Sequence, residues 1–210
     1  MNDRRDEFLV EMYKQMFNDI NRHIMVVWQS VGVLVGSFAI FALVEKKVLS
    51  IDLATTIIIL LCAWLLGHLL DAAYWYNRNL AIIANIERQF LKEPDLRVIH
   101  YYFGKHRPDN KMITHLRIQE ALGLGLGALV LLYHFLTRIT PGFFVSLSNF
   151  DPIRVLPYGT IIAALLYLRY LKNDRKLAYQ EFLENSPGID ISTKDIRYGT
   201  GHGFGKTSSG

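Results

Sequence analysis

The stretch LATTIIILLCAWLLGHLLDAAYWYNRNLAIIANIER, residues 53–88, decides the fold of this chain. Its first third, residues 53–66, is almost wholly apolar, and no proline separates it from the more polar residues that follow. An unbroken apolar run of this kind is typical of a helix buried in lipid. We therefore predict a single helix that starts in a membrane and finishes in water.

Three further apolar segments flank this helix. Residues 24–44 carry no charge, and 21 residues at about 1.5 Å each cross roughly 30 Å of hydrocarbon. The turn at residues 45–52 is too short for a domain, so the next helix must return antiparallel and form a hairpin. Residues 118–136 and 155–171 predict a second, shorter hairpin. Glycines are frequent in the third segment, which favours close helix packing in lipid.

The predicted fold is an all-α integral membrane protein with four transmembrane helices in two hairpins and amphipathic cytoplasmic extensions. The amphipathic N-terminal segment has a polar face of mixed sign, which favours packing on another helix over lying on the membrane surface. The expected segments are a cytoplasmic amphipathic helix (1–23), a first hairpin (24–76), a cytoplasmic helical segment (77–117), a second hairpin (118–171), a cytoplasmic helix (172–188) and a flexible tail (189–210).

Basic residues predict the orientation of these spans. Lys and Arg number 4 in residues 1–23, 8 in residues 77–117 and 7 in residues 169–210, whereas the two turns on the other side hold 2 each. Since basic loops stay in the cytoplasm, the ratio of 19 to 4 predicts that both termini are cytoplasmic. The expected location is the cell inner membrane.

One pair of ionisable residues lies deep in the second span. His68 and Asp71 share a helix face with Trp64 and Trp75, at spacings of 4, 3 and 4 residues. A functional pair would line a pore or relay protons. A structural pair would sit at the cytoplasmic rim, with the tryptophans in an interfacial belt and Arg78 neutralising Asp71. The rim interpretation is favoured, and both remain open.

Small and polar residues form two further helix faces. Gly32 and Gly36 share a face with Gln29, and Gly123 and Gly127 share a face with His134. Glycines at this spacing let helices approach closely. Helix packing is therefore the favoured explanation, and a pore lined by Gln29 and other small or polar groups is the alternative.

Several function classes lack support in the sequence. A net charge of +4 with dispersed basic residues does not indicate nucleic-acid binding, and one cysteine gives neither a disulfide framework nor a cysteine metal site. His100, His106 and His115 lack a zinc-binding spacing. Gly205-Lys206-Thr207 lacks the earlier glycine and the helix of a phosphate-binding loop. We expect no enzyme activity, cofactor or metal.

The organisation of residues 5–92, a short-turn membrane hairpin flanked by cytoplasmic amphipathic helices, resembles the small membrane effectors of bacterial antiphage systems. Those effectors accompany retron, cyclic-oligonucleotide or Kiwa-type modules. The resemblance implies a homo-oligomer that responds to a partner or signal and permeabilises the inner membrane.

Three functions are therefore considered. The first is an inner-membrane effector or pore-forming subunit that oligomerises and perturbs membrane integrity when a partner signals, in antiphage defence. The second is a non-conducting scaffold whose cytoplasmic helices recruit a soluble protein. The third is a small ion or proton channel that uses His68 and Asp71.

Overall fold

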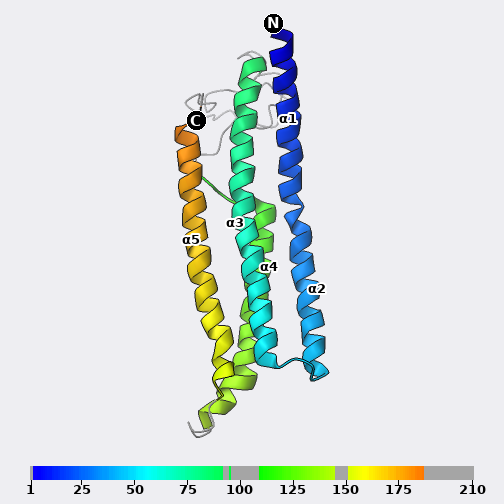
Figure 1. The fold of residues 1–210 in the computed structure, drawn as a ribbon, viewed down its shortest axis with the longest axis vertical. Coiled ribbons are helices and arrows are strands. Elements are labelled where there is room, and N and C mark those ends of the chain that lie inside the picture. The colour runs from blue at the N-terminus through cyan, green and yellow to red at the C-terminus, as the bar shows by residue number, and fades with distance from the viewer. Residues whose placement is uncertain (1, 92–94, 96–108, 145–150, 187–210) are drawn as a thin grey trace, which may run out of the picture. The chain divides into compact units, whose positions relative to one another are not determined.

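The computed structural model describes residues 2–91, 95, 109–144 and 151–186, and every regular element in these ranges is a helix. The prediction of an all-α fold is therefore confirmed for the described residues. The long helices are α1 (Asn2–Ile24), α2 (Val26–Glu45), α3 (Ile51–Phe90), α4 (Thr114–His134) and α5 (Leu156–Glu184), shown in Figure 1. A π-helical turn (Phe135–Ile139) and a 3-10 turn (Thr140–Phe144) continue α4, and another 3-10 turn (Pro152–Val155) precedes α5.

Within the described ranges, three helices are long and apolar enough to cross a membrane: α2, α3, and α4 with the turns that continue it. This supports the prediction of a membrane protein. Helix α5 is not one of the three, so the fourth span stays a prediction.

Contacts divide the chain into two units that share α3. The apolar unit comprises Ile24–Ala73 and Met112–Arg175. The charged unit comprises Met1–His23, Tyr74–Lys111 and Lys176–Gly210, and takes in the polar parts of α1, α3 and α5. The predicted cytoplasmic segments fall mostly in the charged unit; residues 92–94, 96–108 and the tail at 189–210 lie outside the described residues.

The apolar unit has one hydrophobic core, built around α3. Ile58, Leu65 and Leu69 of α3 are almost fully buried, and they pack with side chains from α2 and α4. Large apolar side chains also cover the outside of α2 and α4, where Trp28 is 65% exposed and Leu129 is 64% exposed. Such an apolar exterior suits lipid rather than water.

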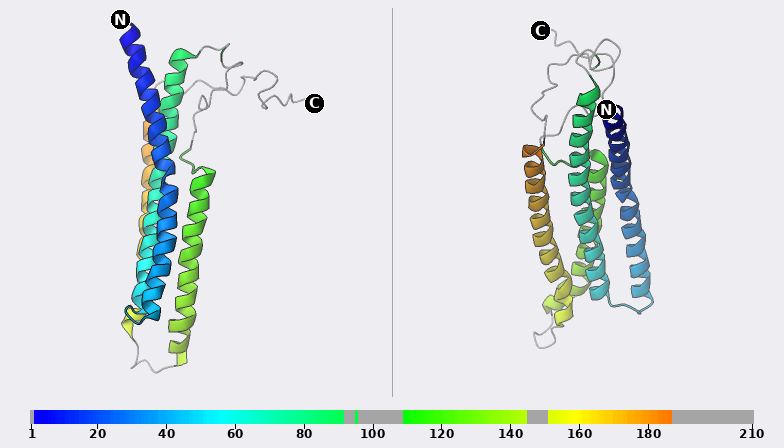
Figure 2. Two further views of the ribbon diagram at one scale, coloured as in Figure 1. Left: turned by 90° about the vertical axis from the view of Figure 1, so that its right-hand side faces the viewer. Right: turned by 45° about the horizontal axis from the view of Figure 1, so that its top comes forward.

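A tight turn joins α2 to α3. Lys47 adopts the left-handed conformation, with φ of 57°, and its amide donates to the carbonyl of Val44. Ser50 then caps α3, because its hydroxyl accepts a hydrogen bond from the amide of Leu53 at 3.3 Å. This turn and the described ends of the α4–α5 connection lie at the same end of the apolar unit (Figures 1 and 2).

The charged unit packs α1 and the end of α5 against the second half of α3. Ile83 of α3 and Tyr179 of α5 are fully buried. Asn77 is also fully buried, and its amide donates to Asn110 at 2.9 Å and to the carbonyl of Lys111 at 3.0 Å. These bonds hold the residues that precede α4 beside α3.

Candidate functional site

The most buried charge in the described part of the chain is Asp52, in the first turn of α3. It is only 1% exposed. A carboxylate in a helix's first turn is favoured by the helix dipole. That stabilisation is small beside the cost of removing an isolated charge from water, so Asp52 requires cationic or hydrogen-bonding partners.

The partners of Asp52 come from the end of α4 and the π-helical turn after it. His134, which is fully buried, places its Nε2 atom 2.9 Å from Oδ1 of Asp52. Arg138 donates from Nε to Oδ1 at 3.1 Å and from Nη2 to Oδ2 at 2.8 Å. This two-pronged contact is the strong geometry for a guanidinium on a carboxylate.

A tyrosine from α5 completes the Asp52 cluster, which consists of Asp52, His134, Arg138 and Tyr158. The Tyr158 hydroxyl lies 3.1 Å from Nδ1 of His134. Because a carboxylate only accepts hydrogen bonds, Nε2 of His134 must carry the proton that it shares with Asp52. In the neutral imidazole, Nδ1 then accepts a hydrogen bond from Tyr158.

The Asp52 cluster joins the start of α3, the end of α4 and the start of α5. With a neutral His134 its charges sum to zero, since Arg138 balances Asp52. Arg138 also lies 3.7 Å from Asp151, which is partly exposed. A buried ion pair stabilises a fold little overall, but removal of one partner costs about 3–5 kcal/mol. The cluster is therefore suited to holding α3, α4 and α5 in one arrangement.

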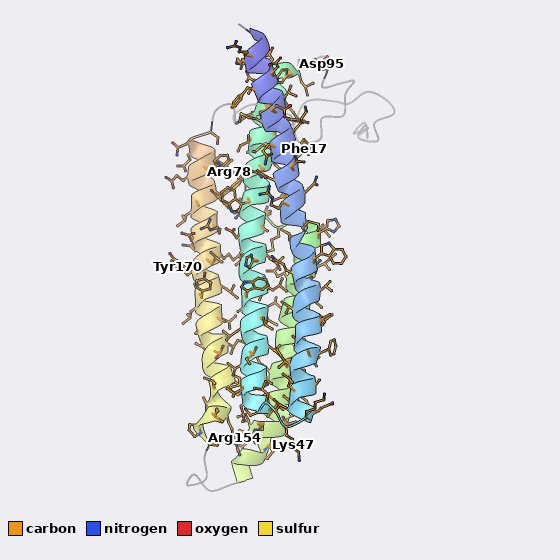
Figure 3. The ribbon with its side chains drawn as sticks, turned by 45° about the vertical axis from the view of Figure 1, so that its right-hand side comes forward. Phe17, Lys47, Arg78, Asp95, Arg154 and Tyr170 are labelled. Carbon is orange, nitrogen blue, oxygen red and sulfur yellow. The ribbon has the colours of Figure 1, made fainter. Side chains whose placement is uncertain are left out.

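This end of the apolar unit carries further basic side chains. Lys47 and Arg154 both lie there (Figure 3). Arg154 approaches the position that a side chain at Gly142 would occupy, with Nη1 3.4 Å from an added Cβ atom. The turn after α2 and the described parts of the α4–α5 connection thus lie at the same end of the apolar unit as the Asp52 cluster.

The sequence does not identify Asp52 or Arg138 as candidate site residues, because both fall in the expected turns between membrane helices. One signal pointed to the cluster: His134 and Arg138 are four residues apart, so they share a helix face. What the sequence could not supply is the position of Asp52, 82 residues from His134 along the chain.

His68 and Asp71 lie apart from the Asp52 cluster, farther along α3. His68 is exposed and packs edge-on against Trp64, with ring centroids 4.5 Å apart. Asp71 forms an ion pair with Arg175 of α5 at 3.3 Å, and both side chains are partly exposed. Arg78, the partner of Asp71 that the sequence suggests, instead lies over the rings of Trp75 and Phe182.

The two glycine pairs have different surroundings. A Cβ atom added at Gly123 would lie 3.4 Å from Leu65 of α3, and one at Gly127 would lie 3.9 Å from Cys62. At Gly32 and Gly36, an added Cβ atom would meet no described atom within 4 Å. Gly123 and Gly127 thus allow α4 to approach α3, whereas Gly32 and Gly36 lie on a surface of α2 that no described atom covers.

The polar residues near the start of α2 lie close to α4. Ser30 is buried and donates to Gln119 of α4 at 2.6 Å. The side-chain oxygen of Gln29 is buried and has no hydrogen-bond partner within the described residues. Gln29 is thus a polar group on the same helix face as the two open glycines.

The charged unit has its own polar contact between α1 and α3. Tyr13 donates from its hydroxyl to Glu87, which is 8% exposed, at 3.2 Å. Burial and the neighbouring Glu87 carboxylate raise the pKa of Tyr13 to about 12. Nearby, Arg5 donates to Gln89 at 3.1 Å, beside a cavity of about 760 Å³ between α1, α3 and α5.

Among the described residues, no three His, Cys, Asp or Glu side chains are grouped to hold a metal ion. His115 is exposed at the start of α4, while His100 and His106 lie outside the described residues.

No protein-family model matches this sequence, and comparisons with curated proteins and with solved structures also gave no match. The function must therefore be argued from the geometry.

Proposed function

We propose that this protein is a homo-oligomeric inner-membrane effector whose Asp52 cluster holds a closed arrangement of four membrane helices. A signal that separates α3 from α4 breaks the cluster, and the rearranged helices make the membrane leak. The burial of Asp52 and His134 within their cluster is the observation that carries this proposal. A charge buried away from water is costly, and ionisable groups within membrane helices are often found where a membrane protein works.

Two further features support an effector. The apolar exterior of the apolar unit and the open surface at Gly32 and Gly36 suit association of copies within a bilayer. The charged unit shares α3 with the apolar unit, so a partner bound to the charged unit acts on the helix that carries Asp52. The resemblance in organisation to antiphage effectors makes phage infection the first signal to test.

The four-span arrangement, with both termini cytoplasmic, is part of this proposal. It rests on the distribution of basic residues and on α5, whose first half is apolar and whose Ile162, Leu166 and Tyr167 are each at least 59% exposed. In this orientation the Asp52 cluster lies at the outer side of the membrane, and the charged unit lies in the cytoplasm.

The test is membrane potential in bacteria that express the wild type or Asp52→Asn, followed with a potential-sensitive dye. Asparagine keeps the shape of the side chain but removes the charge that Arg138 balances. We expect Asp52→Asn, and independently Arg138→Gln, to depolarise cells at expression levels that the wild type tolerates. Asp151→Asn, which changes only the partly exposed neighbour of Arg138, is the control and should resemble the wild type.

The same variants in dye-loaded liposomes separate a direct leak from a cellular response. Assembled Asp52→Asn protein that releases no dye would refute the effector proposal.

A non-conducting scaffold is the second candidate, and the cavity of the charged unit favours it. Apolar side chains such as Leu9, Ile82 and Phe182 line this cavity together with polar Arg5 and Asn185, a mixture suited to a protein partner. Recovery of a stable soluble partner, combined with intact liposomes, would support the scaffold. The third candidate, a channel using His68 and Asp71, predicts that Asp71→Asn abolishes conductance without loss of assembly.

A further inference from the structure

Helices α3 and α5 form a groove in the apolar unit, separate from the Asp52 cluster, and this cavity is open to the outside along Leu60, Trp64 and Tyr167. Its volume is about 690 Å³, within the usual range of about 300–1,000 Å³ for small-ligand sites. It follows α3 from Leu60 to Asp71 and α5 from Thr160 to Leu171. The lining residues are Leu60, Ala63, Trp64, Gly67, His68, Asp71, Thr160, Ala163, Ala164, Tyr167 and Leu171.

Small side chains create this space. Ala63 on α3 and Ala163 and Ala164 on α5 line the cavity. The Thr160 hydroxyl donates to the carbonyl of Leu156 at 2.9 Å, so its hydrogen is already used within α5. The helices approach each other at Gly67, where an added Cβ atom would lie 3.7 Å from Leu171.

The cavity is polar at one end only. Asp71 and His68 lie at the end of its α3 wall, and Oδ1 of Asp71 is 3.3 Å from Nη1 of Arg175. Nη2 of Arg175 lies 3.2 Å from Asp174, and Lys172 is exposed on the preceding turn of α5. At the polar end, Asp71 thus lines the cavity, and Arg175 lies beside it between the carboxylates of Asp71 and Asp174.

The length of the cavity matches one leaflet of a bilayer. Leu60 and Asp71 are 11 residues apart, which is about 16 Å along a helix. Half of the roughly 30 Å hydrocarbon core is about 15 Å. An apolar channel of this length, alongside a membrane-long helix and ending in paired opposite charges, has the dimensions of one lipid molecule.

We propose that this cavity binds a phospholipid with a zwitterionic, amine-bearing headgroup, of the phosphatidylethanolamine class. One acyl chain lies along Ala63 and Ala164. The ammonium group lies against the Asp71 carboxylate, and the phosphate lies against Arg175, which is 3.3 Å from Asp71. Charge complementarity selects this headgroup, because its ammonium group can pair with the Asp71 carboxylate, whereas an anionic lipid has no cation to offer to Asp71 or Asp174.

The test uses full-length protein in a mild detergent, incubated with equal amounts of palmitoyl-oleoyl phosphatidylethanolamine and phosphatidylglycerol, with bound lipid counted by native mass spectrometry. We expect about tenfold more phosphatidylethanolamine than phosphatidylglycerol to be retained, as one charge-assisted hydrogen bond would give. Asp71→Asn should bring this ratio close to one. Ala164→Leu, which fills the cavity, should lower retention of phosphatidylethanolamine about tenfold.

Ala128→Leu is the matched control, because Ala128 is exposed on α4 and does not line this cavity. Ala163→Val is a milder filling variant in case Ala164→Leu disturbs the fold, which circular dichroism and gel filtration would detect. Equal retention by the wild type and both filling variants would overturn the proposal, because it would indicate surface lipid only. A preference for phosphatidylglycerol would overturn the headgroup assignment.

The lipid site requires that the apolar unit lies in a bilayer, but it does not require effector activity. Loss of bound lipid with an unchanged leak, or the reverse, would therefore decide the two proposals separately.

Discussion

Removal of the Asp52 charge should destabilise the protein far more than removal of any partly exposed carboxylate. Asp52→Asn leaves Arg138 beside a neutral amide, and it weakens the hydrogen bond from His134. Breaking a buried pair costs about 3–5 kcal/mol. Arg138 is 30% exposed, and water can solvate part of its charge, so we expect a loss near the lower limit, about 3 kcal/mol.

A double-mutant cycle isolates the interaction itself. Arg138→Met alone leaves Asp52 buried with only His134, and should also cost about 3 kcal/mol. The double variant has no unbalanced charge, so it should be about 1–2 kcal/mol more stable than the two single losses predict. The measurement is the free energy of unfolding in detergent micelles during denaturant titration, followed by tryptophan fluorescence.

The pair Asp71 and Arg175 provides the matched control cycle. These side chains are 44% and 30% exposed, so solvent weakens their attraction to at most about 1 kcal/mol. If the coupling between Asp52 and Arg138 is no larger than that between Asp71 and Arg175, burial does not strengthen the cluster. The cluster would then be too weak to fix the arrangement of α3 and α4.

Three further predictions concern other parts of the chain. Gly36→Leu should reduce oligomer size in cross-linking without loss of helicity, whereas Gly123→Leu should destabilise the protomer, because a Cβ atom there already meets Leu65 at 3.4 Å. Tyr13→Phe should change the pH dependence of the melting temperature, because the pKa of Tyr13 is about 12 in the folded protein and about 10 in the unfolded chain. The wild type should therefore lose stability between about pH 10 and 12, and the variant should not. The same slope in both proteins would show that the contact between Tyr13 and Glu87 does not contribute to stability. Asn77→Ala should lower the unfolding free energy by about 2 kcal/mol through two lost buried hydrogen bonds, and a change below 0.5 kcal/mol would mean that they contribute little.

The helices themselves were predictable because each has a periodic or continuous apolar pattern. The amphipathic pattern of residues 3–23 appears as α1, and the run through residues 53–88 forms a single helix, α3. Boundaries were less accurate where the pattern fades. Residues 138–154 were expected to form a loop, yet Arg138 continues α4 as a π-helical turn, because a shift in hydrogen bonding leaves little trace in the amino-acid pattern.

The pairing of charges could not be predicted from local spacing. Within α3, Arg78 follows Asp71 by two turns and looked like its partner, yet the ion pair is formed by Arg175, on another helix. The Asp52 cluster could not be predicted for the same reason, because its residues come from different helices. A helix-face argument relates residues three or four positions apart, whereas both ion pairs depend on how α3 packs against α4 and α5.

A comparison of the two ion pairs of α3 gives a physical reason to assign the proposed switch to Asp52 rather than to Asp71. Asp52 and Asp71 are 19 residues apart, about 28 Å along the helix, close to the thickness of the hydrocarbon core. In the proposed membrane arrangement, each carboxylate would therefore lie near one rim of the hydrocarbon core. Asp71 is 44% exposed and keeps part of its hydration when Arg175 moves away, so its pair can open at little cost. Asp52 is 1% exposed, and a slip of α3 by one residue, about 1.5 Å, would stretch its bond to His134 and both of its bonds to Arg138 at once. Of these two ion pairs, the Asp52 cluster therefore has the sharper energetic difference between two positions of α3, as the proposed switch would require.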